Sequence, residues 1–295
     1  MDISQYFISG DIKGAINYMC EHEEFKDILN TYITLFEKEE YLNYEIPDVL
    51  NDILRFYQIY YHNLFYCNMP LNEADDILLT SLKEYIGFKD ANEMELKEKL
   101  ESLFEANGYH ALFGKTQGYY GPYIWKETIP TSYEVELPDI TAEYKVNILK
   151  GFIFRGWMDY LTFGRFGTGG WAAEDGTICC IEKAYDFKSE RFLVSLLKHE
   201  AQHTVDMKEF PGITETELEY RAKLVELCYT ENPALLSKFI TEADNSREND
   251  SHALAAYRIR QNFPDIDLNN VKEIQNHALI LFNLSNEEMK EKYQK

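Results

Sequence analysis

The sequence has 295 residues, of which 45% are apolar and 15% aromatic. This length and this apolar content predict a folded protein with two domains, or with one large domain and an appended subdomain, and they exclude global disorder. The net charge is −22, and no cluster of Lys and Arg offers the basic face that nucleic acid binding requires. Nucleic acid is therefore excluded as a partner.

Three further features concern the location of the protein. The longest stretch without Asp, Glu, Lys or Arg runs from Phe56 to Asn72, but polar residues and Pro70 interrupt it, so we expect no membrane span. The first residues lack the basic region and apolar core of a secretory signal. The five cysteines are scattered without paired metal spacing, which is typical of a reducing compartment. We expect a cytoplasmic protein.

The first third of the chain is acidic and is predicted to be helical. Residues 1–106 contain 22 acidic and 8 basic side chains, which places −14 of the net charge there. Apolar residues at helical spacing predict a helix over 48–66. Asn72 is expected to cap a second helix that ends at Gly87, and Asn92 a third that ends at Gly108. We predict an acidic helical N-terminal region over residues 1–115, which could dock a protein partner, cover a substrate site or pack against a sheet.

Residues 116–295 form the second predicted domain. Aromatic and β-branched residues with Gly and Pro between them predict a sheet over 119–185. The pattern then predicts a helix over 189–208 and a helical C-terminal subdomain over 213–295. The predicted fold class is therefore α+β, with a small sheet and a motif helix, a helical C-terminal half and an N-terminal helical region.

The helix predicted over 189–208 contains the sequence His-Glu-Ala-Gln-His. Residues four apart lie on the same helix face, so His199 and His203 can direct ring nitrogens at one Zn²⁺ about 2.0–2.1 Å away. Glu200 can reach a water molecule on that ion without being a ligand. This spacing predicts a zinc site with Glu200 as general base, and the alternative is a solvated helix face with two ordinary histidines.

Catalytic zinc usually has three protein ligands, so two histidines leave the site incomplete. Pro211-Gly212 interrupts the chain, and Thr214 or Thr216 can cap a new helix. The first turns of that helix carry Glu215, Glu217 and Glu219. One of these carboxylates is expected to complete the ligand set.

The motif His199-Glu200-x-x-His203 followed by Glu219 resembles the gluzincin class of zinc metallopeptidases, whose third ligand is a glutamate on the helix after the motif. The string Glu219-Tyr-Arg-Ala-Lys223 is similar to the Glu-x-x-Ala-Asp pattern of the membrane-embedded prenyl-processing and heat-shock zinc proteases. The resemblance covers residues 130–260 and implies a zincin-like metallopeptidase core with Glu219 as the third ligand. Lys223 replaces the Asp that orients a ligand histidine in that pattern, so Asp206 or Glu226 is expected to act instead.

The resemblance also implies a substrate-binding segment. Zincin-like folds place an edge strand that pairs with extended substrate just upstream of the motif helix. The segment Gly169-Gly170-Trp171 occupies that place, and its glycines would allow close approach of a peptide backbone. The alternative is a tight hairpin with an aromatic core residue.

A transition-state donor is expected downstream of the ligands. Gluzincins carry a His or Tyr there that stabilises the oxyanion formed during amide hydrolysis. His252 occupies the corresponding place, with Tyr257 as the alternative. Asp250 or Ser251 can cap a helix that holds His252 in its first turn.

These features predict a soluble zinc metallopeptidase that acts on a peptide or protein substrate. Zinc would lower the pKa of its water towards 7, and Glu200 would take the proton and pass it to the leaving amine. One alternative is a catalytically silent protein that uses the zincin fold for binding or regulation. Another is a zinc hydrolase that acts on a non-peptide amide.

Overall fold

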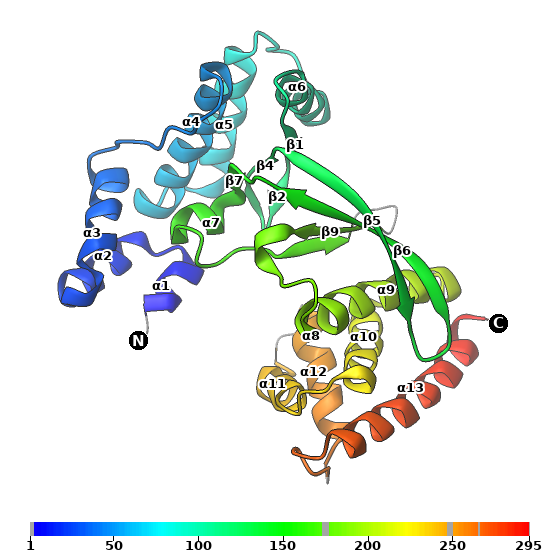
Figure 1. Cartoon of the computed structure of the whole chain (residues 1–295). Coiled ribbons are helices and arrows are strands. Elements are labelled where there is room, and N and C mark those ends of the chain that lie inside the picture. Colours follow the sequence, from blue (N-terminus) through cyan, green and yellow to red (C-terminus); the bar gives the residue numbers. More distant parts are fainter. Residues whose placement is uncertain (1–2, 173–176, 247–249, 265, 295) are drawn as a thin grey trace. The chain divides into compact units, whose positions relative to one another are not determined.

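A computed structural model describes residues 3–172, 177–246, 250–264 and 266–294. The chain divides into two compact units (Figure 1). The first comprises Met1–Thr128 and Leu149–Thr168, and the second Ile129–Ile148 and Gly169–Lys295. Each unit has its own apolar core. The fold class is α+β, and the boundary expected between residues 115 and 116 lies within the first unit.

The first unit is mainly helical. Its α-helices are α1 (Ile3–Ser9), α2 (Ile12–Cys20), α3 (Lys26–Tyr32), α4 (Asp48–Tyr61), α5 (Leu71–Tyr85), α6 (Glu93–Ala106) and α7 (Gly156–Thr162). Asn92 caps α6 in a capping box with Glu95, so that predicted helix start is confirmed. The predicted cap at Asn72 is wrong, because α5 begins directly after Pro70. Proline has a φ that suits a helix start and needs no N–H partner there.

Short strands and aromatic rings complete the first unit. Strands β1 (His110–Leu112), β4 (Tyr123–Trp125) and β7 (Phe154–Arg155) form one antiparallel sheet, and β2 (Lys115–Thr116) pairs with β3 (Tyr119–Tyr120). Inside the core, the Tyr61 ring lies 5.4 Å from that of Tyr160 and 6.3 Å from that of Phe154. Such ring pairs stabilise a core beyond the area they bury.

The second unit contains a four-stranded sheet. Its strand order is β5 (Glu127–Glu136), β6 (Thr141–Lys150), β9 (Ile178–Ile181) and β8 (Gly170–Ala172), so β8 lies at one end. β8 and β9 are antiparallel, with Gly170 opposite Cys180. A Cβ at Gly170 would lie 2.5 Å from the carbonyl oxygen of Cys179, so only glycine fits there. The segment predicted to bind substrate is thus part of a hairpin and also lies at an end of the sheet.

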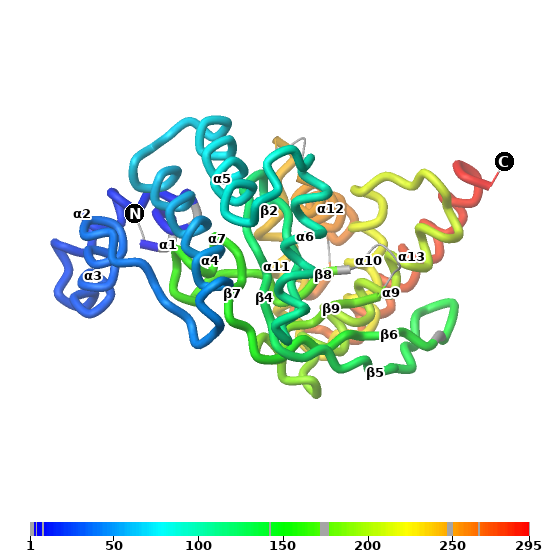
Figure 2. Tube along the Cα trace, turned by 90° about the horizontal axis from the view of Figure 1, so that it is seen from above, coloured from blue at the N-terminus to red at the C-terminus, as the bar shows by residue number. Residues whose placement is uncertain are grey.

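Helices pack around α10 in the second unit. The segments α8 (Glu190–Phe192), η5 (Leu193–Lys198, π-helical) and α9 (His199–Glu209) follow one another directly, and they correspond to the helix predicted over 189–208. Helix α10 (Glu215–Tyr229) contacts α9, α12 (Ser251–Asn262) and α13 (Val271–Tyr293), while α11 (Ala234–Glu242) packs on α12 (Figure 1, Figure 2). Among the helices that the structure describes, none has the length and apolar content needed to cross a membrane.

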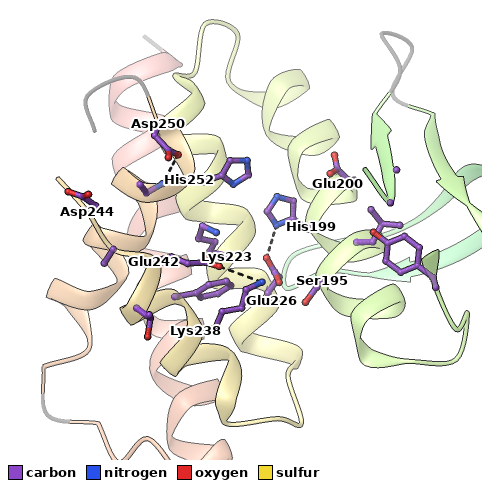
Figure 3. A pocket seen from close by; sticks show the side chains of 18 residues that line it. Ser195, His199, Glu200, Lys223, Glu226, Lys238, Glu242, Asp244, Asp250 and His252 are labelled. Carbon is purple, nitrogen blue, oxygen red and sulfur yellow. Dashed lines mark hydrogen bonds and ion pairs between the residues drawn. The ribbon is translucent and has the colours of Figure 1, made fainter. Parts of the chain in front are cut away.

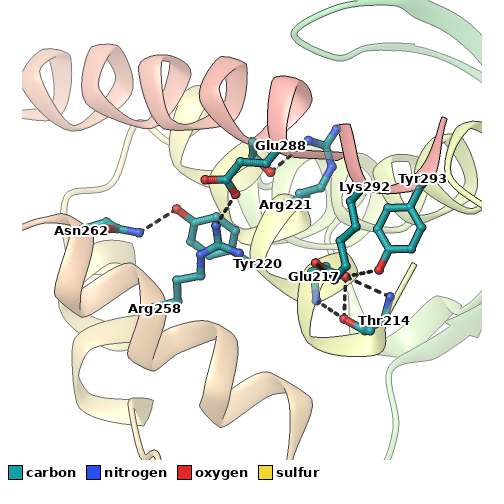
Figure 4. A network of polar contacts seen from close by, with 10 residues as sticks. Thr214, Glu217, Tyr220, Arg221, Arg258, Asn262, Glu288, Lys292 and Tyr293 are labelled. Atoms are coloured by element: carbon teal, nitrogen blue, oxygen red, sulfur yellow. Dashed lines mark hydrogen bonds and ion pairs between the residues drawn. The ribbon is translucent and has the colours of Figure 1, made fainter. Parts of the chain in front are cut away.

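Polar contacts, some of them buried, connect α10 to its neighbours (Figure 4). Arg221 donates from Nε to Asp206 Oδ2 on α9 over 2.9 Å and from one terminal nitrogen to Ser285 Oγ on α13 over 3.2 Å. At the start of α10, Glu217 forms a capping box with Thr214 and accepts hydrogen bonds from α13. These contacts fix the position of α10 relative to α9 and α13.

Candidate metal centre

The two histidines of the motif face each other at the start of α9. Their Nε2 atoms are 2.9 Å apart, and their ring centroids are 4.6 Å apart. The π-helical segment η5 ends directly before His199, and such segments are frequent at functional sites. Tyr144 on β6 donates a hydrogen bond of 3.0 Å to the carbonyl of Ala201, which ties α9 to the sheet.

Glu219 on α10 joins the two imidazoles. Its Oε1 lies 3.3 Å from Nε2 of His203, and its Oε2 lies 3.5 Å from Nε2 of His199. The other two candidate ligands are elsewhere, because Glu215 is exposed and Glu217 is engaged by its capping box and by α13. Of the three glutamates, Glu219 alone is brought to the histidine pair.

The spacing of these donor atoms suits a divalent cation. Ligand atoms about 2.0–2.2 Å from a tetrahedral metal ion are separated from one another by about 3.3–3.6 Å. The two Nε2 atoms are 2.9 Å apart, and each has an oxygen of Glu219 at a comparable distance, Oε1 at 3.3 Å from His203 and Oε2 at 3.5 Å from His199. With one ligand atom taken from each residue, the three atoms lie within 4.8 Å of one another. Oε2 of Glu219 is buried and makes no hydrogen bond of acceptable geometry in the described part of the chain, although ring nitrogens of His252 and His199 lie 2.8 and 3.5 Å from it. His199, His203 and Glu219 therefore form a group that could hold a metal ion.

The charges in this cluster support the same interpretation. Burial lowers the pKa of His199, but contacts with Glu219 and Glu226 outweigh it and raise that pKa to about 10. Burial raises the pKa of Glu219, but the three surrounding imidazoles hold it well below its ordinary value. The cluster thus attracts positive charge, and a metal ion bound through Nε2 would take the place of a proton.

Glu226 orients the first histidine. Its Oε1 accepts a hydrogen bond of 2.7 Å from Nδ1 of His199. Asp206, the other residue considered for this role, instead accepts hydrogen bonds from Gln202 and Arg221. Nδ1 of His203 is buried without a hydrogen-bond partner among the residues that the structure describes. The carboxylate that supports a candidate ligand is therefore Glu226, and of the two histidines it contacts His199.

His252 also lies at the centre. Of the two predicted caps, Asp250 is the one that caps α12, and it places His252 in the first turn of the helix. Its Nδ1 is 2.8 Å from Oε2 of Glu219, while 65% of its side chain remains exposed. Tyr257, the alternative donor, packs its ring under Arg260 and is not part of the pocket wall next to the cluster. The structure thus brings His252 to the cluster and leaves Tyr257 away from it.

A pocket of about 760 Å³ opens beside the cluster (Figure 3). Glu200 lines it, and its carboxylate makes no hydrogen bond or ion pair with any residue in the described ranges. Gly169 and Gly170 also line the pocket, whereas Trp171 does not. The pocket therefore brings the predicted general base and the end of the sheet to the same space.

Several residues of the pocket wall were not predicted to have a role, and two of them, Tyr185 and Lys223, carry polar groups near the predicted site. Tyr185 follows the sheet and lines the wall near Gly169. Lys223 lies on α10 one turn after Glu219, a spacing that places both on one helix face and could have indicated its position. Tyr185 carries no comparable signal, because its place depends on how the chain turns after β9.

Comparison of the chain with protein-family models, curated proteins and solved structures finds no match. Any function must therefore be inferred from the chemistry of the site itself.

Proposed function

We propose that the chain is a zinc-dependent peptidase whose second unit is a zincin-like catalytic core. The observation that carries this proposal is the convergence of His199, His203 and Glu219, whose donor atoms lie within 4.8 Å of one another. Two imidazoles and one carboxylate form a ligand set that is common in catalytic zinc sites, where a fourth position stays open. When bound, zinc would polarise the scissile carbonyl and lower the pKa of a water molecule.

Glu200 is the proposed general base. It follows the first ligand on α9, lines the pocket and has no competing contact in the described part of the chain. It removes a proton from the attacking water and delivers that proton to the leaving amine. An uncommitted carboxylate at this position favours a catalyst over a silent binding protein.

The remaining residues position the reacting groups. Glu226 holds Nδ1 of His199, so Nε2 of that ring faces the cluster. His252 presents a largely exposed ring whose Nδ1 faces Glu219 and whose Nε2 makes no hydrogen bond within the described ranges. In its doubly protonated form the ring donates from Nδ1 to Glu219 and from Nε2 to the oxyanion. Gly169 and Gly170, at the end of the sheet, accept an extended backbone, which favours a peptide over a non-peptide amide.

Replacement of the general base tests this function. Zinc-loaded wild-type chain is incubated with a mixed library of quenched fluorescent peptides beside Glu200→Gln. We expect the variant to retain its zinc and to lose about 10²–10⁴-fold in turnover. Glu209→Gln, on the exposed end of the same helix, is the matched control and should cleave normally. Undiminished cleavage by Glu200→Gln, or no cleavage by the fully loaded wild type, would contradict the proposal.

A further inference from the structure

Lys223 is a buried cation in the wall of the candidate active site. It lies on α10, four residues after Glu219, and only 4% of its surface is exposed. Its Nζ is 4.4 Å from the centroid of the Phe239 ring, which also lines the pocket. No hydrogen bond or ion pair connects it to another residue in the ranges that the structure describes. A lysine is rarely buried to this extent without an anionic partner.

Three of the carboxylates that line the pocket have partners of their own. Glu226 accepts the hydrogen bond from Nδ1 of His199, and Glu242 lies 3.7 Å from Nζ of Lys238. Asp250 caps α12. Glu200 also lines the pocket and has no partner in the described ranges, but it lies on the opposite side of His199 from Lys223 (Figure 3). The ammonium group of Lys223 therefore faces the pocket without an acidic side chain paired with it in the described part of the chain, and an anionic ligand would compensate its charge.

The location of Lys223 relative to the reacting groups limits which part of a substrate it can reach. In Figure 3, Glu200 and Lys223 lie on opposite sides of His199. Four residues of helix separate Lys223 from Glu219, which corresponds to about 6 Å along the axis of α10. One residue of an extended substrate spans about 3.3–3.6 Å. A substrate group bound by Lys223 would therefore lie one or two substrate residues from the peptide bond that is placed at the metal centre.

We propose that Lys223 binds a carboxylate of the substrate, located one or two residues from the cleaved bond. This inference rests on the proposed peptidase function and names the substrate class of the same site. Two sources offer this chemistry, the free carboxyl terminus of a short peptide and an acidic side chain. An ammonium group supplies three donors for such a contact, and the hydrogen bonds would be charge-assisted.

Binding of matched peptides tests this assignment without requiring turnover. The probes are an N-acetylated alanine tripeptide with a free carboxylate, its C-terminal amide, and an amide that carries one Glu. Affinities are measured by calorimetry on the zinc-loaded full chain with Glu200→Gln, so that no peptide is consumed. We expect the free acid or the Glu peptide to bind about 10- to 100-fold more tightly than the plain amide.

Variants of Lys223 identify the residue responsible. In Lys223→Met the carboxylate peptides and the plain amide should bind with about equal affinity. The affinity for the plain amide itself should be unchanged, because methionine keeps the apolar stem that packs on Phe239. Lys223→Arg should retain a preference for carboxylate. Lys238→Met, a lysine of the same pocket that is 64% exposed and paired with Glu242, is the matched control and should keep the full preference. Thermal melting verifies that each variant is folded, and Lys223→Gln replaces Lys223→Met if methionine disrupts folding.

The outcomes separate this inference from the proposed function. Equal affinities for the acids and the plain amide, a preference that survives in Lys223→Met, or binding of none of the three peptides would overturn the role of Lys223. If wild-type chain cleaves peptides but shows no carboxylate preference, the peptidase stands and the inference fails. If it cleaves nothing yet keeps a preference that depends on Lys223, the peptidase proposal fails and the carboxylate site stands.

Discussion

Glu226 accepts a hydrogen bond of 2.7 Å from Nδ1 of His199, on the side of the ring opposite the nitrogen that faces Glu219. A proton held on Nδ1 leaves the lone pair of Nε2 available to a metal ion. Both glutamates are on α10, seven residues apart, so two turns of one helix provide both a candidate ligand and the support of another ligand.

Replacement of Glu226 should weaken the metal centre. In Glu226→Ala we expect zinc affinity to fall about 10- to 100-fold, because the ring of His199 loses the contact that fixes its orientation. Glu226→Gln can still accept a hydrogen bond and should lose less. Competition with a chromophoric chelator at fixed pH measures both values.

Glu242→Gln is the control for Glu226, because it removes another carboxylate of the same pocket that is not in contact with a histidine. It should leave zinc affinity unchanged. A loss as large as that of Glu226→Ala would attribute the effect to the general negative charge of the pocket and would contradict the orienting role.

Some of the centre could be predicted from local sequence, and some could not. The spacing of His199 and His203 fixes their relation because both lie on one helix, whatever the rest of the fold does. Glu219 required the resemblance, because Glu215 and Glu217 are carboxylates in the first turns of the same helix and sequence spacing alone does not separate the three. The choice between Asp206 and Glu226 depended on which carboxylate meets Arg221, and that is decided by the packing of α9 against α10.

The buried ion pair of Asp206 on α9 and Arg221 on α10 should contribute to the stability of the folded chain. Asp206→Asn leaves the guanidinium of Arg221 buried without its anionic partner, and we expect a loss of about 3–5 kcal/mol in the free energy of unfolding. Urea unfolding at a fixed zinc concentration measures it. Burial raises the pKa of Asp206, whereas Arg221 and Gln202 lower it by favouring the ionised form. The contacts of Asp206 therefore offset only part of the cost of removing its charge from water.

The more exposed pair of Arg258 and Glu288, between α12 and α13, is the comparison for the buried pair (Figure 4). Glu288→Gln should lower the free energy of unfolding by no more than about 1 kcal/mol, because solvent screens exposed charges. Equal losses in Asp206→Asn and Glu288→Gln would show that burial of Asp206 and Arg221 does not govern their contribution.

His252 and Tyr257 should differ in their effect on catalysis. His252→Ala is expected to lower kcat/KM by about 10²–10³-fold with most of the loss in kcat, because a donor to the oxyanion acts in the transition state. Tyr257→Phe should leave both constants unchanged, since this ring lies outside the pocket wall. Peptide cleavage by matched zinc-loaded preparations provides the comparison.

Zinc content distinguishes two roles of His252, because its Nδ1 also lies beside Glu219. Full zinc content in His252→Ala together with low kcat agrees with a donor. Loss of zinc in that variant would instead make His252 a positioning residue for the third ligand, and the assignment as donor would be wrong.

Two helix starts in this fold could be predicted from local sequence, whereas the burial of α10 could not. The cap at Asn92 and the capping box of Thr214 with Glu217 involve residues three apart, so local patterns are sufficient. Helix α10 is different, because its Glu, Arg and Lys side chains are typical of a solvent-facing helix, yet every residue from Glu219 to Leu227 is buried. Its neighbours α9, α12 and α13 supply the partners, and their arrangement is a tertiary property.

The metal content of the purified chain tests the central claim most directly. After equilibration with excess zinc and removal of the unbound ion, elemental analysis should find one zinc per wild-type chain. His203→Ala and Glu219→Ala should each lose it, while Glu215→Ala, which removes an exposed carboxylate at the start of the same helix, should retain it. Zinc retained in full by His203→Ala and Glu219→Ala, or absent from the wild type, would contradict a metal centre formed by these residues.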